Sequence, residues 1–334
     1  MVSPKIGIIG TGNMGRIHAR VLSSLRMLSG VMDVDIDAAK RVADMYGVRA
    51  FSDYHELVEE MSLDGVIIST PTSTHSSIAE DIASKHDSIR AMLIEKPIAS
   101  TLKDAEHVAE TLRKRGIVAI VSHSEIYNPI VGRALSLIRE GAIGTPKNII
   151  HDRRGFVQPS RIHSLGDVFE DLGVHDFDIM TRISTGRAKL YAQCITEGGV
   201  CNAATVMVKF ESGSDHVFHL SRQYAGRARM MDVSGSKGAL ILDLFAQIIK
   251  VKDLDQEPMS EDQTIRLPER GATIKVYGEP VREVINDLVK VIETGSEPLV
   301  GLDDGVAAMR LVEAARQSAK NGTVVDIDIE AAKR

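Results

Sequence analysis

The chain has 334 residues, of which 43% are hydrophobic, and a net charge of −6. This length favours two domains. The acidic balance, the lack of tryptophan and the 4% of aromatic residues argue against nucleic acid binding. No apolar run approaches the roughly 18 residues that span a bilayer, and the N-terminus lacks the layout of a signal peptide. We therefore expect a cytoplasmic protein that binds neither nucleic acid nor membranes.

The sequence contains two cysteines, Cys194 and Cys201. Two cysteines in so long a chain form neither a disulfide framework nor a zinc site. We expect both to be reduced and to lie in strands, and we expect no metal site.

Near the N-terminus, a short apolar run precedes glycines in the spacing G-x-G-x-x-G. Residues 6–9 predict a buried strand, and a helical apolar stripe begins at residue 13. Gly10 allows the tight turn, Gly12 lets the backbone approach a pyrophosphate, and Gly15 lets helix and strand pack closely. The amides at the helix start favour an anion. This context predicts a dinucleotide site; an ordinary glycine turn is the alternative.

An acidic residue follows these glycines at the distance that such sites use. Asp33 ends the apolar run 28–32, where a carboxylate can accept hydrogen bonds from ribose hydroxyls. A carboxylate would repel a 2′-phosphate, so we expect NAD(H) rather than NADP(H), although Lys40 and Arg41 lie nearby.

Further apolar runs at 65–69, 91–94 and 117–121 alternate with helical patterns, including 102–115. Short runs of this kind are typical of strands buried on both faces of a parallel sheet. The alternation predicts an α/β fold with a doubly wound parallel sheet.

Polar residues follow two of these strands, where ligands bind in open α/β sheets. Thr70 and Pro71 begin a loop whose hydroxyls can cap the next helix. His75 either lines the cofactor groove or is a capping or surface residue. Glu95 and Lys96 precede a proline after the next strand. Because burying charges is costly, this pair predicts a functional site; a structural ion pair is the alternative.

The second half of the chain is rich in β-forming runs separated by Gly, Ser and Asn, which predicts neighbouring antiparallel strands. An open sheet needs a cover on each face. The helix from Phe169 onward can cover one face and another subunit the other, so we expect a homo-oligomer. The polar segment 256–269 predicts a surface loop. The predicted strands are 190–195, 203–210, 217–222 and 230–233, and the last helices are 280–294 and 304–321.

Asp171, His175 and Asp178 stand at i, i+4 and i+7. On a helix they share one face, and two acids with a histidine on one stripe need a partner. A bound substrate is one explanation; a surface acid patch or an ion-paired histidine is the other.

Together these motifs resemble the glucose–fructose oxidoreductase / inositol dehydrogenase / MocA (Gfo/Idh/MocA) family of sugar dehydrogenases. The resemblance runs almost end to end and includes 235–238 and the helix beginning near Leu302. It implies an NAD-binding Rossmann domain over 1–122 and, over 123–334, an α/β domain with a large, mostly antiparallel open sheet that often packs subunits together. The expected cofactor-binding residues are Gly10, Gly12, Asn13, Met14, Gly15, Asp33, Thr70, Pro71, His75, Glu95 and Lys96.

The resemblance also implies that Lys96, Asp171 and His175 meet at the substrate as catalytic residues. The implied reaction oxidises a secondary alcohol on a sugar ring, with His175 as general base, since an ordinary imidazole titrates near pH 6.5. Lys96 would stabilise the developing alkoxide, and Asp171 would contact a substrate hydroxyl or orient the pair. Glu95 would face the nicotinamide ribose, and a cis Pro97, frequent in the family, would direct Lys96.

Two stretches resemble the branch that oxidises UDP-linked amino sugars at C3. The first commonly reads His-x-Glu-Arg-Phe-Asn-Pro, and this chain has Ile126 and Tyr127 in place of the Arg and Phe. The second is rich in arginine, which suits phosphate, although a solvated basic loop is equally compatible. The expected substrate-binding residues are His123, Tyr127, Asn128, Arg153, Arg154, Arg161, Asp171 and His175.

Three functions follow from these patterns. The first, which the two stretches favour, is an NAD-dependent dehydrogenase of a nucleotide sugar, namely a UDP-linked amino sugar. The second is a dehydrogenase of a free polyol or sugar of the inositol type. The third is a dinucleotide-binding sensor without turnover, against which the complete set Lys96, Asp171 and His175 argues.

Overall fold

The computed structural model describes residues 3–158, 162, 165–253 and 271–330, and the chain divides into two compact units. Unit 1 comprises Met1–Tyr127 and Glu279–Arg310, and unit 2 comprises Asn128–Gly278 and Leu311–Arg334. The expected boundary after residue 122 lies close to the first division. The return of residues 279–310 to unit 1 was not foreseen.

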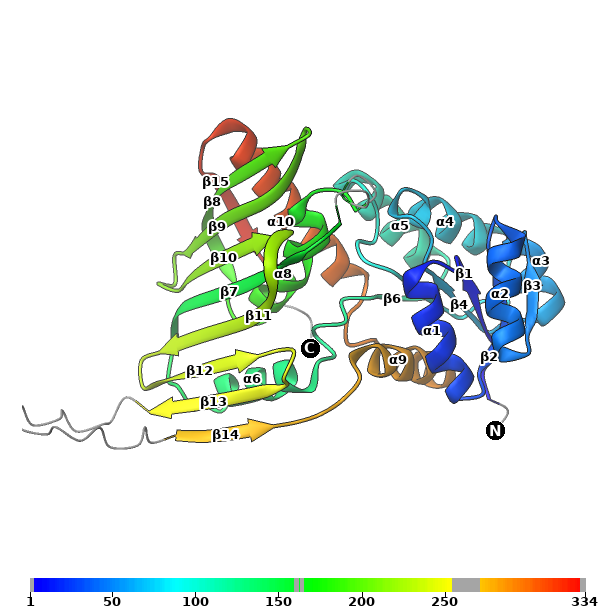
Figure 1. Cartoon of the computed structure of the whole chain (residues 1–334), viewed down its shortest axis with the longest axis horizontal. Coiled ribbons are helices and arrows are strands. Elements are labelled where there is room, and N and C mark those ends of the chain that lie inside the picture. The colour runs from blue at the N-terminus through cyan, green and yellow to red at the C-terminus, as the bar shows by residue number, and fades with distance from the viewer. Residues whose placement is uncertain (1–2, 159–161, 163–164, 254–270, 331–334) are drawn as a thin grey trace, which may run out of the picture. The chain divides into compact units, whose positions relative to one another are not determined.

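Unit 1 is built on a six-stranded sheet in the order β3-β2-β1-β4-β5-β6, and all of its paired strands are parallel (Figure 1). This order, with its reversal between β1 and β4, is that of dinucleotide-binding folds, so the predicted doubly wound sheet is confirmed. The strands are β1 Ile6–Ile9, β2 Leu28–Met32, β3 Arg49–Phe51, β4 Gly65–Ile68, β5 Ala91–Ile94 and β6 Val118–Val121.

The helices of unit 1 include two that come from the far end of the chain. Gly65 makes room for Ile292 of α9, because a Cβ on Gly65 would lie 2.7 Å from the Ile292 side chain. Gly305 in α10 approaches Val121 of β6 equally closely. The helices are α1 Asn13–Ser24, α2 Ile36–Tyr46, α3 Tyr54–Met61, the short 3₁₀ turn η1 Thr72–Thr74, α4 His75–Lys85, α5 Leu102–Lys114, α9 Pro280–Thr294 and the first half of α10 Leu302–Asn321.

Unit 2 is built on a nine-stranded sheet in the order β14-β13-β12-β11-β7-β10-β9-β8-β15. In the described part of the chain its pairs are antiparallel except for β7 with β10. The mostly antiparallel sheet is therefore confirmed, with more and longer strands than predicted. They are β7 Pro146–Phe156, β8 Gly186–Glu197, β9 Val200–Phe210, β10 Asp215–Ser221, β11 Gln223–Gly235, β12 Gly238–Asp243, β13 Ile248–Asp253, β14 Gly271–Lys275 and β15 Val325–Ile329.

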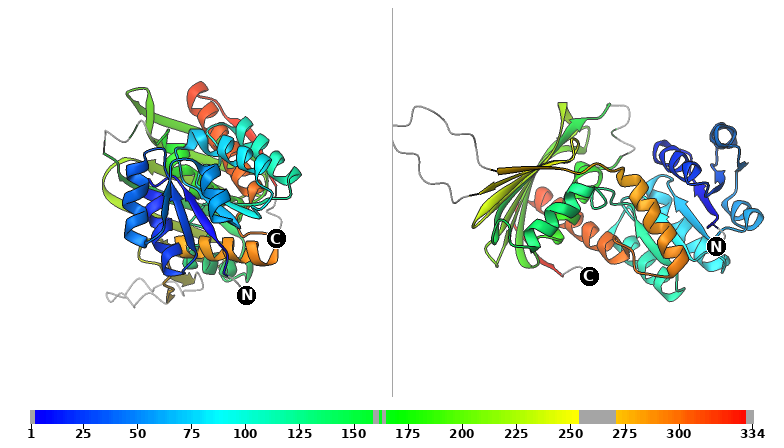
Figure 2. Two further views of the ribbon diagram at one scale, coloured as in Figure 1. Left: turned by 90° about the vertical axis from the view of Figure 1, so that its right-hand side faces the viewer. Right: turned by 90° about the horizontal axis from the view of Figure 1, so that it is seen from below.

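Helices cover one face of this sheet (Figure 2). They are α6 Pro129–Arg139, the π turn η2 Phe169–Gly173, α8 Val174–Thr181 and the second half of α10. Alternation along the strands turns one set of side chains toward these helices, for example Val206 and Val208, while Met207 between them is 52% exposed. The predicted loop 256–269 lies outside the described residues. No helix in the described ranges is long and apolar enough to cross a membrane.

The two cysteines differ from the expectation. A disulfide joins Cys194 of β8 to Cys201 of β9, with Cα atoms 5.8 Å apart. The expectation of two reduced thiols was therefore wrong. It failed because the pairing of β8 with β9 brings the two residues close together, with Cys201 opposite Thr196, and composition alone does not reveal this pairing. A cytoplasmic location stays a prediction, and disulfides are uncommon there.

A pair of buried histidines lies in the core of unit 2. The Nε2 atom of His151 is 3.2 Å from Nδ1 of His216, whose Nε2 lies 2.9 Å from the Ser184 hydroxyl. Burial, together with the charge of Arg153, lowers the pKa of His151 to about 3. Burial and the neighbouring His151 hold the pKa of His216 well below its usual value. Both side chains are therefore neutral in the folded protein at neutral pH.

We expect this pair to make unit 2 labile in acid. In the unfolded chain both histidines bind protons below about pH 6.5, whereas in the fold they do so only at much lower pH, so stability present above about pH 6.5 is lost as the pH falls. The slope should approach about 1.4 kcal/mol per pH unit for each histidine. Thermal melts between pH 7.5 and 4.5 should show a shallower slope for His151→Phe. The exposed control His219→Phe should retain the wild-type slope; equal slopes in all three proteins would contradict the assignment.

Candidate functional site

The turn between β1 and α1 has the geometry that a pyrophosphate requires. Gly10 has φ +94°, and a Cβ there would lie 2.8 Å from the backbone of Ser69. A Cβ on Gly15 would overlap the carbonyl oxygen of Gly10. Next to Gly12 there is open space, with no atom within 4 Å of an added Cβ. Gly10 and Gly15 are therefore needed for packing, whereas Gly12 leaves room for a ligand.

The start of α1 is prepared for negative charge. Gly12 is its N-cap and offers no side chain to the first amides, and the first turn, which contains Asn13 and Met14, carries no acid. Those N–H groups and the positive end of the helix dipole suit a phosphate. The residues present thus fit the pyrophosphate of NAD.

Asp33 is the acid at the end of β2, and it also organises the glycine turn. Its Oδ2 accepts hydrogen bonds from both the amide and the hydroxyl of Thr11, each at 2.8 Å, and its Oδ1 accepts one from the amide of Asp35 at 3.1 Å. A carboxylate oxygen has two lone-pair sites, so acceptor capacity remains for ribose hydroxyls.

The loop after β4 is tied to the turn after β5 by a buried histidine. His75 has Nδ1 2.9 Å from the carbonyl oxygen of Pro97 and Nε2 2.9 Å from that of Thr70. A neutral imidazole can donate to one of these at a time. The structure therefore gives His75 a linking position between the two loops; its contact with cofactor stays a prediction, as do those of Thr70 and Pro71.

Glu95 is buried beside α1. Its Oε1 lies 2.7 Å from Nε2 of His18, and its Oε2 accepts from the Lys96 amide at 3.3 Å. Burial alone would raise the pKa of the Glu95 carboxyl, but hydrogen bonds from His18 and Ser122 and the charge of His18 hold that pKa below its usual value. The anion is therefore stable inside the unit, and it connects the nucleotide helix with the backbone of Lys96. The Lys96–Pro97 bond is cis, as the resemblance implied.

In unit 2 the segment that bears Asp171 and His175 begins as a π turn rather than a regular α-helix. Asp171 lies within η2, and His175 lies in the first turn of α8. The segment therefore departs from the regular helix that the spacing assumed, and the expectation that Asp171 and His175 share one face stays a prediction. Asp178 is buried and accepts a hydrogen bond from Nε of Arg182 at 2.9 Å, which is a structural ion pair. Single π turns inside helices occur frequently at functional sites.

Of three residues expected at the substrate, one is buried and two make contacts within the fold. His123 is buried in the turn after β6. The Tyr127 hydroxyl donates to Asp287 of α9 at 2.8 Å. Asn128 caps α6 by accepting from the Ile130 amide at 3.3 Å. Tyr127 and Asn128 thus have structural roles that need no substrate. Binding of a substrate by any of the three stays a prediction.

The arginines expected to bind a diphosphate are paired within unit 2. Arg153 is buried and forms a two-pronged ion pair with Asp176, at 2.7 and 2.9 Å. Arg154 donates to Asp152 at 2.6 Å, and its guanidinium lies 4.5 Å from the centre of the Tyr224 ring. In both arginines the Nε and Nη2 donors are thus engaged by a carboxylate. Arg161 lies outside the described residues.

Comparisons with known proteins identify the family. The chain matches the GFO/IDH/MocA oxidoreductase family, with its NAD-binding Rossmann fold, over residues 4–123, and the C-terminal domain of that family over 131–241. It is 27% identical to the myo-inositol 2-dehydrogenase of Thermotoga maritima, covering 97% of this chain and 98% of that protein. It is 27% identical to the UDP-N-acetylglucosamine 3-dehydrogenase of Acidithiobacillus ferrooxidans, covering 95% and 96%.

Solved structures show the same fold. That of the Acidithiobacillus ferrooxidans UDP-N-acetylglucosamine 3-dehydrogenase gives a TM-score of 0.83 at 22% identity over 96% of this chain and 99% of that one. A levoglucosan dehydrogenase in complex with NADH and levoglucosan gives 0.84 at 18% over 97% and 99%. The nucleotide turn and the family matches define an NAD-dependent oxidoreductase. The chain belongs to the GFO/IDH/MocA family, whose members act on sugars and polyols.

Two residues of these sites were not identified from the sequence. His18 stands five residues after Asn13 in α1, where its spacing shows only that it faces inward. Arg222 follows the apolar alternation of β10 and is fully buried. The sequence signal for Arg222 was its position at the end of a predicted strand. This position does not show which residues its side chain contacts.

We expect Asp33 to set the preference for NAD over NADP. Asp33→Ala should weaken NAD binding about tenfold, and the loss of repulsion toward a 2′-phosphate should narrow the difference between the two cofactors. The protein contains no tryptophan, so nicotinamide fluorescence can follow titrations with NADH and with NADPH. These titrations give the dissociation constant for each cofactor. Asp37→Asn, an exposed acid in the first turn of α2, is the matched control. Unchanged discrimination in Asp33→Ala would contradict this role.

Proposed function

We propose that this protein oxidises a secondary ring hydroxyl of a free polyol or sugar, with His175 as the general base and Lys96 as the group that stabilises the developing alkoxide. Bound NAD supplies the hydride acceptor. The observation that carries the choice of substrate is the buried ion pair between Arg153 and Asp176, because it engages one of the arginines that were expected to bind a diphosphate.

The roles of the chain's own residues follow from their chemistry. The His175 imidazole takes the hydroxyl proton, and positioned proton transfer contributes about 10²–10⁴-fold in rate. Lys96 offers ammonium donors to the same oxygen as negative charge develops there. Its backbone is held by the Glu95 carboxylate, which in turn is paired with His18. Asp171 accepts a hydrogen bond from a neighbouring hydroxyl of the substrate or orients the other two groups.

A nucleotide sugar is the second candidate. Similarity to the UDP-N-acetylglucosamine 3-dehydrogenase of Acidithiobacillus ferrooxidans supports it. The sequence favoured this substrate because two stretches, one of them rich in arginine, resemble the branch that oxidises UDP-linked amino sugars. Arg153 and Arg154 are already paired with carboxylates. This pairing favours an uncharged sugar or polyol over a substrate that carries a diphosphate.

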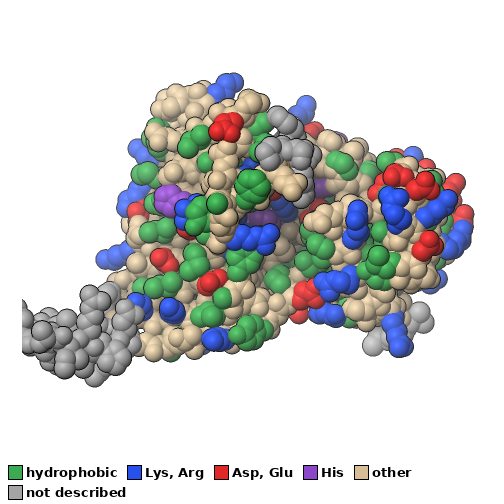
Figure 3. Space-filling view, in the orientation of Figure 1, with side chains coloured by type: hydrophobic (Ala, Val, Ile, Leu, Met, Phe, Trp, Pro, Cys, Tyr) green, Lys and Arg blue, Asp and Glu red, His purple; other side chains and the backbone are tan. Residues whose placement is uncertain are grey.

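We also propose that the uncovered face of the nine-stranded sheet packs against a second copy of the chain. A row of apolar side chains crosses this face, since Tyr191 pairs with Met207, Met207 with Val217 and Val217 with Ile150. Met207 and Ile150 are 52% and 37% exposed. Hydrophobic side chains lie among charged ones over these strands in Figure 3. Such a continuous apolar row on a sheet is typical of an interface.

The substrate is tested by screening NAD reduction. We expect inositols and free sugars to give NADH, and UDP-N-acetylglucosamine to give little. His175→Asn and Lys96→Met should each lower kcat by about 10²–10⁴-fold, while NADH binding stays intact. His219→Asn, an exposed histidine of β10, is the control and should retain full activity. Strong turnover of UDP-sugars alone would favour the second candidate, and NADH binding without turnover of any substrate would indicate a sensor.

The interface is tested by light scattering after size-exclusion chromatography. The wild type should elute as an oligomer, and Met207→Asp should lower its mass or weaken its association, because a charge would be buried in an apolar row. The control Lys209→Asp changes the next outward position of the same strand. A monomeric wild type would contradict the proposal.

A further inference from the structure

Among the residues that the structure describes, Arg222 has the largest fully buried side chain, with 0% of its surface exposed, and this side chain carries a charge. It stands between β10 and β11. Burying a guanidinium is costly unless its donors and charge find partners. Its partners therefore indicate what the residue is for.

The contacts of Arg222 converge on the segment before His175. Its Nη1 donates to the carbonyl oxygen of Gly166 at 2.9 Å and lies 3.7 Å from Oδ2 of Asp171. Its Nη2 donates to Oδ1 of Asn202 at 2.7 Å and to the carbonyl oxygen of Cys201 at 3.4 Å. Asp171 is thus the one carboxylate among these partners, and the others are neutral.

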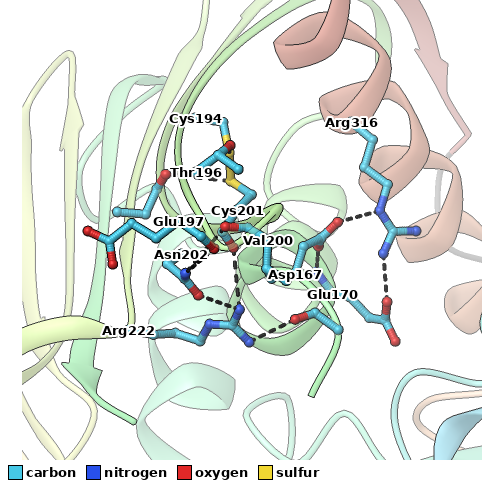
Figure 4. Close-up of a disulfide and its surroundings, with 12 residues drawn as sticks. Asp167, Glu170, Cys194, Thr196, Glu197, Val200, Cys201, Asn202, Arg222 and Arg316 are labelled. Atoms are coloured by element: carbon cyan, nitrogen blue, oxygen red, sulfur yellow. Dashed lines mark hydrogen bonds and ion pairs between the residues drawn. A yellow bond between two sulfur atoms is a disulfide. The ribbon is translucent and has the colours of Figure 1, made fainter. Parts of the chain in front are cut away.

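The partners on β9 form a firm anchor. Cys201 belongs to the disulfide with Cys194, and Asn202 follows it directly, as Figure 4 shows. The backbone of Arg222 is fixed to the same strand, since its amide donates to the Asn202 carbonyl at 2.9 Å. The guanidinium therefore reaches from a cross-linked hairpin to the turn that carries Asp171.

A second arginine holds the same turn from α10. Arg316 donates through Nε to Asp167 and through another nitrogen to Glu170, both at 2.6 Å (Figure 4). Between the two arginines lies Gly166, with φ +66°, where a Cβ would meet the Glu170 carboxylate at 2.6 Å. Arg222 and Arg316 thus both hold this turn. Of the two arginines, Arg222 is the one that also lies beside Asp171.

We propose that Arg222 is a positioning residue, which holds Asp171 and the π turn so that Asp171 and His175 face the substrate hydroxyls together. This inference rests on the proposed function. A lysine could keep the charge but not the planar fork that reaches Gly166 and Asn202 at once. Arg222 would act through Asp171 and touch no substrate itself.

The chain offers a matched control in Arg182. Its side chain is also buried, 3% exposed, and it pairs with Asp178 farther along the same helix. Arg182→Met removes a buried ion pair from unit 2 without touching Asp171. Arg222→Met and Arg182→Met should therefore both lower Tm, whereas only Arg222→Met should impair the site.

The test uses the full-length chain and its best substrate from the screen, at a temperature well below each Tm. We expect Arg222→Met to lose about 100-fold in kcat and Arg222→Lys about tenfold, with KM for NAD within twofold of the wild type. Arg182→Met should keep kcat within about threefold. Equal losses in the two methionine variants would overturn the proposal. If Arg222→Met does not fold, Asn202→Ala, which removes one anchor of the fork, replaces it in the same comparison.

Amide hydrogen exchange tests the role of Arg222 without measuring turnover. Residues 166–173 should exchange at least tenfold faster in Arg222→Met than in the wild type, and Arg182→Met should leave this segment unchanged. Unaltered exchange over 166–173 in Arg222→Met would overturn the proposal whatever the activity. A wild type that reduces no NAD with any substrate, yet shows the expected exchange, would refute the proposed function instead.

Discussion

Charges buried in the interior must be paired, and in this protein the pairs hold the backbone segments that carry the candidate catalytic groups. In unit 1 the Glu95 carboxylate joins His18 of the nucleotide helix to the amide of Lys96. In unit 2 Arg222 lies beside Asp171, and Arg182 pairs with Asp178. Because removing one partner would leave an uncompensated charge, each pair restricts where its neighbours can move. The movement of a reactive group next to such a pair is restricted in the same way.

The features that the sequence predicted are those that depend on local spacing. The positions of Gly10, Gly15 and Asp33 could be read from the sequence because each must satisfy a contact within one strand–turn–helix unit. The parallel sheet followed from the alternation of short apolar runs with helical ones. The family motif placed Lys96 before a cis proline, as found.

The features that the sequence missed depend on which segments meet. Arg153 was interpreted as either a phosphate ligand or part of a solvated basic loop. Its pairing with Asp176 was not predicted, because nothing in the spacing of 23 residues indicates it. The i, i+4 spacing of Asp171 and His175 assumed a regular helix, and the sequence did not predict that this segment begins as a π turn. The disulfide likewise depends on strand register. Pairings between distant residues are properties of the packed chain, so composition and periodicity do not reveal them.

The return of residues 279–310 to unit 1 has a consequence for how such a protein can be divided. The nucleotide-binding unit is not a continuous stretch of the gene. A chimera that exchanges only residues 1–127 would place one protein's Gly65 against another's Ile292, where a larger or smaller side chain clashes or leaves a void. Recombination between relatives at that junction is therefore disfavoured unless the last two helices are inherited with the first six strands.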